Sequence, residues 1–211
     1  MAYFPFFVDV KDKKCCIIGG GIVALRKVEA LLQFEADITV ISPAICEELL
    51  RYGHVIQLIN RAFVEHDLEG AWFVIAATNQ PELNARIAWL CREKNILVNA
   101  VDEKENCDFL FPAFVKKGDI SIGITTSGQS PVMAAHIKKQ VSDQLPGYYE
   151  ELAVTLGHLR VYVKGQVAKE HLRSEIFKEL FETGRKQLGK ITIQEVDRII
   201  SRHLKENGEK I

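Results

Sequence analysis

The sequence predicts an α/β fold, a doubly wound parallel sheet, which is followed by a small α+β segment and a C-terminal helical domain. Short apolar segments alternate with helical patterns as far as residue 113, which is typical of βαβ units and a parallel sheet. From Pro131 onward the pattern is helical almost throughout. With 211 residues, 47% of them hydrophobic, the chain is long enough to bury a core.

The first half contains the strands and helices of this sheet in alternation. The strands are short and apolar, as in a parallel sheet that is covered on both faces. In the first helix, Val23, Val28, Leu31 and Leu32 recur at helical spacing and are expected to point inward. The predicted strands are 15–18, 38–41, 55–59, 72–77 and 97–101, and the predicted helices are 22–32 and 82–94.

The second half departs from this rhythm after Pro112. Residues 120–125 alternate with period two, which is typical of a strand with dissimilar faces and often of an antiparallel one. Breaks in the helical pattern that follows are expected near Pro146, Gly165, Gly184 and Gly189. The predicted domains are a sheet domain at 1–113, a dimerisation segment at 114–145 and a helical domain at 146–211.

A glycine-rich turn links the first strand to the first helix. The segment 19–24, GGGIVA, fits the pattern G-x-G-x-x-G/A in the position where dinucleotide-binding Rossmann folds carry it. Gly19 permits the tight turn, Gly21 lets the backbone approach a diphosphate, and Ala24 keeps the helix close to the sheet. The helix N-terminus offers free N–H groups to the phosphates. The alternative is a tight turn that binds no ligand.

The ends of the next strands supply further candidates for the cofactor site. Ser42 follows the second strand where an Asp or Glu usually holds the ribose of NAD, and no Arg stands beside it to pair with the phosphate of NADP, so NAD is the expected cofactor. Thr78 and Asn79 lie at the carboxyl edge of the sheet, although they equally suit a turn into the next helix. The full set of candidate cofactor-binding residues is Gly19, Gly20, Gly21, Ile22, Val23, Ser42, Thr78, Asn79 and Asn99.

One carboxylate stands out as a candidate catalytic group. Asp102 ends the strand that contains Asn99, so we expect it at the same edge as the glycine turn, facing the place of a nicotinamide ring. A carboxylate there can accept the proton that leaves when hydride is removed, and partial burial would strengthen it as a base. The alternative is that Asp102 only caps a turn in an acidic stretch.

A hydroxyl-rich turn follows the period-two strand. Ser130 is suited to the N-cap of the next helix and Pro131 to its first position. The remaining hydroxyl and N–H groups are candidates for holding a substrate carboxylate. The candidate substrate-binding residues are Thr126, Ser127, Gly128 and Ser130.

Composition restricts the classes of partner. The net charge is −1, and residues 114–211 carry 16 Lys and Arg against 12 Asp and Glu, which favours a small anionic ligand and is too weak a bias for nucleic acid. Five cysteines without a C-x-x-C pair, and six histidines without metal-ligand spacing, predict reduced thiols and no metal site. The start of the chain lacks the pattern of a signal peptide and no long apolar run follows, so we expect a cytoplasmic protein that is not bound to a membrane.

Several of these segments together resemble the siroheme-synthase family. They are 19–27, 76–79, 98–102, 111–113 and 126–131, in the family's order over nearly the whole chain. More narrowly, the set is similar to the precorrin-2 dehydrogenases, some of which are also sirohydrochlorin ferrochelatases. The 211 residues contain no methyltransferase domain of the kind that trifunctional relatives add, so a stand-alone form is expected.

The resemblance implies NAD-dependent oxidation of the tetrapyrrole precorrin-2 to sirohydrochlorin by a homodimer, with insertion of ferrous iron as a further step in bifunctional members. It places the family's general base at Asp102, and it places Thr126 where the family has a serine. Residues 114–211 would supply contacts to the substrate's carboxylates. The basic candidates are Arg86 in the first half and Lys116, Lys117, Lys138 and Lys139 in the second, and the alternative for each is an ordinary solvated surface charge. The competing hypothesis is a module that senses NAD or NADH without catalysis.

Overall fold

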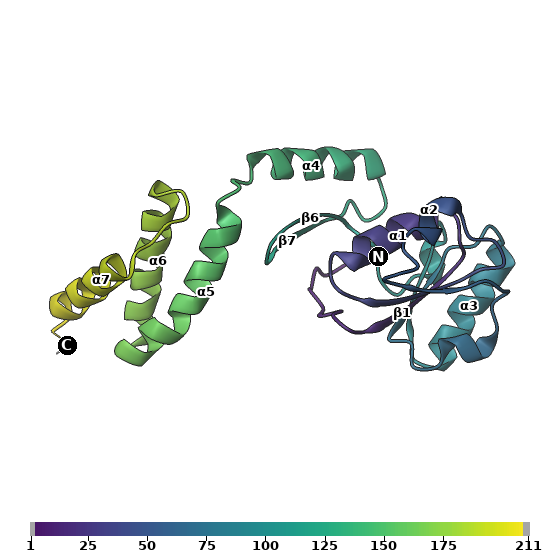
Figure 1. Ribbon diagram of the computed structural model, residues 1–211, viewed down its shortest axis with the longest axis horizontal. Coiled ribbons are helices and arrows are strands. Elements are labelled where there is room, and N and C mark those ends of the chain that lie inside the picture. Colours follow the sequence, from purple (N-terminus) through teal and green to yellow (C-terminus); the bar gives the residue numbers. More distant parts are fainter. Residues whose placement is uncertain (1–2, 209–211) are drawn as a thin grey trace. The chain divides into compact units, whose positions relative to one another are not determined.

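The computed structural model describes residues 3–208 and contains two compact units, of which the first ends at Phe111 and the second begins at Pro112 (Figure 1). In the first unit a parallel sheet has the strand order β3-β2-β1-β4-β5, which confirms the predicted doubly wound architecture. Its strands are β1 (Lys14–Ile18), β2 (Asp37–Ile41), β3 (Gln57–Ile59), β4 (Phe73–Ala76) and β5 (Leu97–Ala100). The helices between them are α1 (Ile22–Leu32), the short α2 (Glu47–Leu50) and α3 (Pro81–Glu93), with single 3-10 turns at Glu65–Leu68 and Lys104–Asn106.

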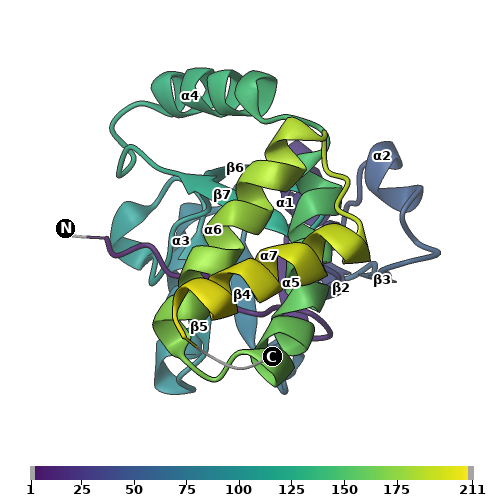
Figure 2. The same cartoon turned by 90° about the vertical axis from the view of Figure 1, so that its left-hand side faces the viewer.

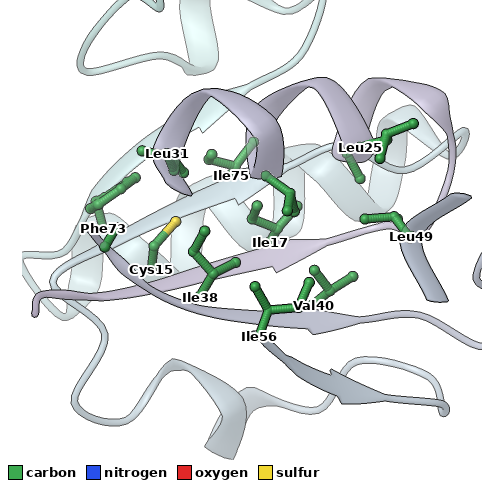
Figure 3. Packing of buried hydrophobic residues seen from close by; sticks show 13 residues of the cluster. Cys15, Ile17, Leu25, Leu31, Ile38, Val40, Leu49, Ile56, Phe73 and Ile75 are labelled. Atoms are coloured by element: carbon green, nitrogen blue, oxygen red, sulfur yellow. The ribbon is translucent and has the colours of Figure 1, made fainter. Parts of the chain in front are cut away.

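Two separate hydrophobic clusters cover the two faces of the sheet. Leu25 and Leu31 of α1 pack on one face, against alternate residues of β1, β2 and β4 (Figure 3). The helix α3 packs on the other face, where Ile87 contributes to the second cluster. The adjacent Cys15 and Cys16 of β1 belong to opposite clusters because successive strand residues point to opposite faces. Each face of the sheet is therefore sealed by its own helix layer.

The predicted strands and helices of this unit lie within one residue of their observed bounds, except for the third strand. The third strand begins at Gln57 instead of residue 55, and the side chain of Val55 is exposed. Val23 was expected to point inward with Val28, but it lies in the first turn of α1 and is 38% exposed, while Val28 is fully buried. The buried face of α1 thus begins at Ala24, and the two residues before it, Ile22 and Val23, face solvent.

The second unit begins with an antiparallel hairpin and continues as helices. The hairpin pairs β6 (Ala113–Lys117), which the sequence analysis did not predict, with β7 (Ile120–Ile124). The helices are α4 (Pro131–Gln144), α5 (Tyr149–Gln166), α6 (Glu170–Lys186) and α7 (Ile193–Glu206). Lys117 holds α4 to the hairpin, because its ammonium donates to the backbone oxygens of Ser142 and Leu145 at the end of that helix.

The last three helices share a hydrophobic cluster, and α6 lies between α5 and α7 (Figure 1). Figure 2 shows α7 crossing in front of the other two. The predicted helix break at Gly184 is wrong. Gly184 lies inside α6 and is buried, and a Cβ there would stand 3.2 Å from Cδ1 of Ile191. The glycine therefore makes room for a close approach of neighbouring side chains. None of the helices in residues 3–208 combines the length and the apolar character needed to cross a bilayer.

Candidate functional site

The glycine turn lies where the strand order of the sheet reverses, between β1 and α1. Gly19 has a φ of +123°, and a Cβ at this position would stand 2.6 Å from the carbonyl carbon of Ala77, just after β4. Gly20 packs with similar closeness on the other side, where a Cβ would stand 2.9 Å from Cβ of Ser42. Both positions therefore require glycine, and the turn is held between the ends of β2 and β4.

The third glycine has open space around it. A Cβ on Gly21 would meet no atom within 4 Å, and its φ of −93° suits any residue, so its own contacts do not require glycine. Gly21 is the N-cap of α1, which has no side-chain cap and no acidic residue in its first turn. The free N–H groups and partial positive charge of this terminus, with no Cβ in front of it, fit the diphosphate of a dinucleotide.

Apolar side chains border this helix terminus. Ile22 is 48% exposed and Val23 is 38% exposed, although both are aliphatic. Exposed aliphatic residues next to free amides suit a ligand that has apolar and anionic parts, as a dinucleotide has. Their contact with the cofactor stays a prediction.

The end of β2 is occupied by a turn built on Ser42. This residue is buried, and its hydroxyl donates to the carbonyl oxygen of Ala44 at 2.8 Å. The same turn lies against Gly20, whose carbonyl oxygen accepts a bond from the amide of Cys46. Ser42 thus has a clear structural role, because it shapes the wall of the glycine turn. Since its hydroxyl proton is used on Ala44, its proposed contact with the ribose would be as an acceptor.

Thr78 and Asn79 follow β4 at the same edge of the sheet. The hydroxyl of Thr78 donates to Oδ1 of Asn84 at 2.7 Å, and the amide of Asn84 donates back to the carbonyl oxygen of Thr78. Thr78 therefore directs the chain into α3, which was the structural alternative for this pair. Asn79 is exposed at the edge.

Asn99 lies one residue before the end of β5 and is buried. Its side-chain amide donates to the carbonyl oxygen of Phe109 at 2.8 Å, which ties the returning chain to the strand. The amide is therefore directed along the sheet toward Phe109. This contact does not support a direct role of Asn99 in cofactor binding, and that role stays a prediction.

Asp102 lies two residues beyond β5, at the carboxyl edge that also carries the glycine turn. The preceding amide, of Val101, donates to the carbonyl oxygen of Ala76 at the end of β4. Asp102 has a left-handed backbone with a φ of +63°. Its side chain is exposed and not partly buried, so the carboxylate is open to a ligand that arrives from solvent.

Sequence reasoning missed a partly buried cation on α1. Lys27 of α1 is half-buried, and its ammonium lies 3.9 Å from the centre of the Phe111 ring. Burial lowers the pKa of Lys27, and the nearby Cys107 and Asp102 act in the opposite direction. The residue ends the segment 19–27 that was quoted for the family resemblance, but its burial depends on the fold of the distant segment 107–111.

The hydroxyl turn belongs to the second unit. Thr126 closes it, since its hydroxyl donates to the carbonyl oxygen of Ser130 and accepts the amide of Ser130. Ser130 accepts the amide of Met133 and is the predicted N-cap of α4. Ser127 and Gly128 between them have φ values of +54° and +79°. A tight turn with a fixed backbone results, and its contact with substrate stays a prediction.

Comparison with known proteins identifies relatives for both units. Residues 6–113 match a family described as "Putative NAD(P)-binding", and residues 117–144 match one described as "Sirohaem biosynthesis protein central". A siroheme synthase of Thioalkalivibrio sulfidiphilus is 35% identical over 204 residues, which cover 92% of this chain and 42% of that protein. A siroheme synthase of Vesicomyosocius okutanii is 33% identical over 183 residues, covering 86% of this chain and 39% of its own length.

The chain thus spans about two fifths of the length of the curated relatives it matches. A solved structure, "SirC, precorrin-2 dehydrogenase", superposes with a TM-score of 0.70 at 22% identity and covers 96% of this chain and all of that one. At this identity the structural likeness establishes the fold. The resemblance drawn from the sequence motifs is confirmed by the relatives, and the NAD(P)-binding character of the first unit is confirmed by the family match.

Proposed function

Because the chain belongs to this NAD(P)-binding family and is related over most of its length to siroheme synthases, we propose that it dehydrogenates precorrin-2 to sirohydrochlorin with NAD as the hydride acceptor. The observation that carries the proposal is the edge of the sheet at which the uncapped N-terminus of α1 and the exposed Asp102 both lie. The first feature suits a diphosphate, and the second supplies a base at the same edge.

We assign cofactor binding, proton transfer and substrate binding to different residues of the chain. Gly21, Ile22 and Val23 would present amides to the diphosphate of NAD, which when bound would supply the hydride acceptor. Asp102 takes the proton that leaves the tetrapyrrole in the same oxidation, so one hydride and one proton are removed together. Thr126, Ser127, Gly128 and Ser130 are proposed to hold a carboxylate of the macrocycle through hydroxyl and amide groups.

Two further parts of the proposal concern assembly and location. Residues 114–145 would form the contact of a homodimer, since the hairpin leaves strand edges that can pair with a second copy. A cytoplasmic site of action is also expected. NAD is preferred over NADP because the turn after β2, Pro43 and Ala44, offers no cation for a ribose phosphate.

The decisive experiment is anaerobic incubation of the purified protein with precorrin-2 and NAD, followed by visible spectroscopy of the product and measurement of NADH. Formation of sirohydrochlorin with one NADH per macrocycle is the expected result. Binding of NAD without any turnover would contradict the proposal and favour a module that senses the cofactor. A second arm with added ferrous iron tests chelation, for which insertion must exceed the spontaneous rate measured without protein.

A further inference from the structure

Lys27 differs from the other lysines of the first unit. Among the lysines that the structure describes there, only Lys14 and Lys27 are partly buried. The ammonium of Lys14 is bound by the carbonyl oxygen of Glu69, whereas Lys27 has no hydrogen-bond or ion-pair partner within residues 3–208. A cation that is partly removed from water without an anionic partner is costly, and such groups mark binding sites more often than exposed ones do.

The position of Lys27 on α1 directs its ammonium toward the candidate site. Helical side chains lean toward the N-terminus of their helix, so Lys27 covers the turn that precedes it. The Phe111 ring forms one wall for the ammonium, and that ring is held by Phe109, whose centroid is 5.7 Å away. Phe109 in turn packs edge-on against Phe73 of β4. The ammonium is therefore positioned by a chain of packed rings.

The segment that holds Lys27 is tied to β5, because Asn99 of that strand donates to the carbonyl oxygen of Phe109, whose ring packs on that of Phe111. The carboxylate of Asp102, which follows β5, also acts electrostatically on Lys27. The strand β5 is separated from β1 by β4. A diphosphate at the first turn of α1 already has the free amides of that turn, so the ammonium is placed for a different anion, next to the proposed base.

We infer that Lys27 binds a carboxylate of the tetrapyrrole substrate beside Asp102. The inference rests on the proposed function, which supplies a substrate with many carboxylates, and it goes further by naming the residue that fixes the macrocycle next to the base. An ammonium that lies on an aromatic face has already lost part of its hydration, so an arriving carboxylate gains a charge-assisted hydrogen bond at a reduced desolvation cost.

The test compares the variants Lys27→Gln, Lys27→Arg and Arg26→Gln with the wild-type protein. Arg26 is the exposed neighbour on α1, and its substitution removes the same charge from the same helix. Binding of sirohydrochlorin and binding of NAD are titrated separately, and the KM and kcat for precorrin-2 are measured. Circular dichroism and denaturation establish that each variant folds, and Lys27→Met serves as a second variant that keeps the apolar stem against Phe111.

The expected result is that Lys27→Gln and Lys27→Met weaken sirohydrochlorin binding and raise KM about tenfold or more, with NAD affinity changed less than about twofold. Lys27→Arg restores most of the affinity, Arg26→Gln has no effect, and added salt weakens binding less in Lys27→Gln than in the wild type. An equal loss of NAD affinity, or unchanged tetrapyrrole binding in a folded Lys27→Gln protein, overturns the inference. In either case, activity of the wild-type protein still supports the proposed function. A wild-type protein that binds no tetrapyrrole overturns both.

Discussion

Gly19 and Ala77 lie so close together that no side chain fits between them: a Cβ on Gly19 would stand 2.6 Å from the carbonyl carbon of Ala77. This contact joins the turn after β1 to the end of β4. The same edge of the sheet carries the N-terminus of α1 and Asp102, so the geometry of the proposed site depends on this backbone approach.

Substitution of Gly19 by Ala is therefore expected to destabilise the protein by about 2 kcal/mol or more. The φ of +123° is strained for any L-residue, and the obstacle is backbone that cannot move like a side chain. Chemical denaturation measures the effect. A Gly19→Ala protein as stable as the wild type would contradict the close approach of Gly19 to the backbone of Ala77.

Substitution of Gly21 by Ala is expected to separate binding from stability. Its Cβ would enter open space at an ordinary φ, so the free energy of unfolding changes by less than about 1 kcal/mol. The added methyl stands where the diphosphate is proposed to approach, and NAD affinity is expected to fall about tenfold or more. Calorimetric titration with NAD checks this, and unchanged affinity would move the diphosphate away from Gly21.

Asp102→Asn tests the proposed base with little structural disturbance. Asparagine tolerates the left-handed backbone that Asp102 adopts, with its φ of +63°, so the turn is kept. Turnover of precorrin-2 is expected to fall about 100-fold or more, while NAD affinity is retained. Steady-state kinetics and NAD titration are the measurements, and a variant with full turnover would remove Asp102 from the mechanism.

The start of α7 predicts an acid-sensitive contribution to stability. Hydrogen bonds from the side chain of Gln187 and from Thr192 lower the pKa of Glu195 from 4.5 to about 2. Because the folded pKa lies below the unfolded one, this contribution is fully present above about pH 4.5 and is lost as the pH falls toward 2. Urea denaturation followed by circular dichroism across this range is expected to show a smaller loss for Glu195→Gln than for the wild type. Identical pH dependence in both proteins would contradict the assignment.

Two glycines of the helical part are expected to respond in opposite directions. Gly157 in α5 has no atom within 4 Å of a Cβ, so Gly157→Ala is expected to stabilise the helix by about 0.5–1 kcal/mol. Gly184 in α6 packs against Leu152 and Ile191, so Gly184→Val is expected to cost about 1–3 kcal/mol through overpacking. Thermal unfolding of the two variants measures both effects, and a stable Gly184→Val protein would mean that α5 and α6 are less closely packed.

The parts of the fold that were predictable are those governed by local pattern. The helix Ile22–Leu32 was predicted with its exact bounds because the glycine turn marks its start and apolar spacing marks its face. The strand Ala113–Lys117 was missed because two lysines close it and its partner lies across a turn, where pairing decides the conformation. Gly184 was misinterpreted as a helix break because the sequence alone does not distinguish a glycine that makes room for neighbouring side chains from a glycine that ends a helix.

The sequence predicted that the candidate site residues lie at strand ends, but it did not predict their burial or their hydrogen bonds. Placement of Asp102 at the carboxyl edge follows from β5 alone, whereas its exposure depends on the positive φ of the turn. Ser42 and Thr78 follow their strands as predicted, but their hydrogen bonds go to Ala44 and Asn84, which no pattern revealed, and their contact with the cofactor stays a prediction. Lys27 was overlooked because the ring that holds it comes from a distant segment.

The two buried thiols of β1 can be used to measure how often the helices that cover the sheet move away from it. Cys15 and Cys16 lie on opposite faces and are fully buried, and burial raises the pKa of both, as it raises the pKa of Cys91 in α3 to about 12. A small alkylating reagent reaches them only when a helix layer lifts away. The rate at which each thiol is labelled in the native protein therefore reports how often the corresponding side of the sheet opens.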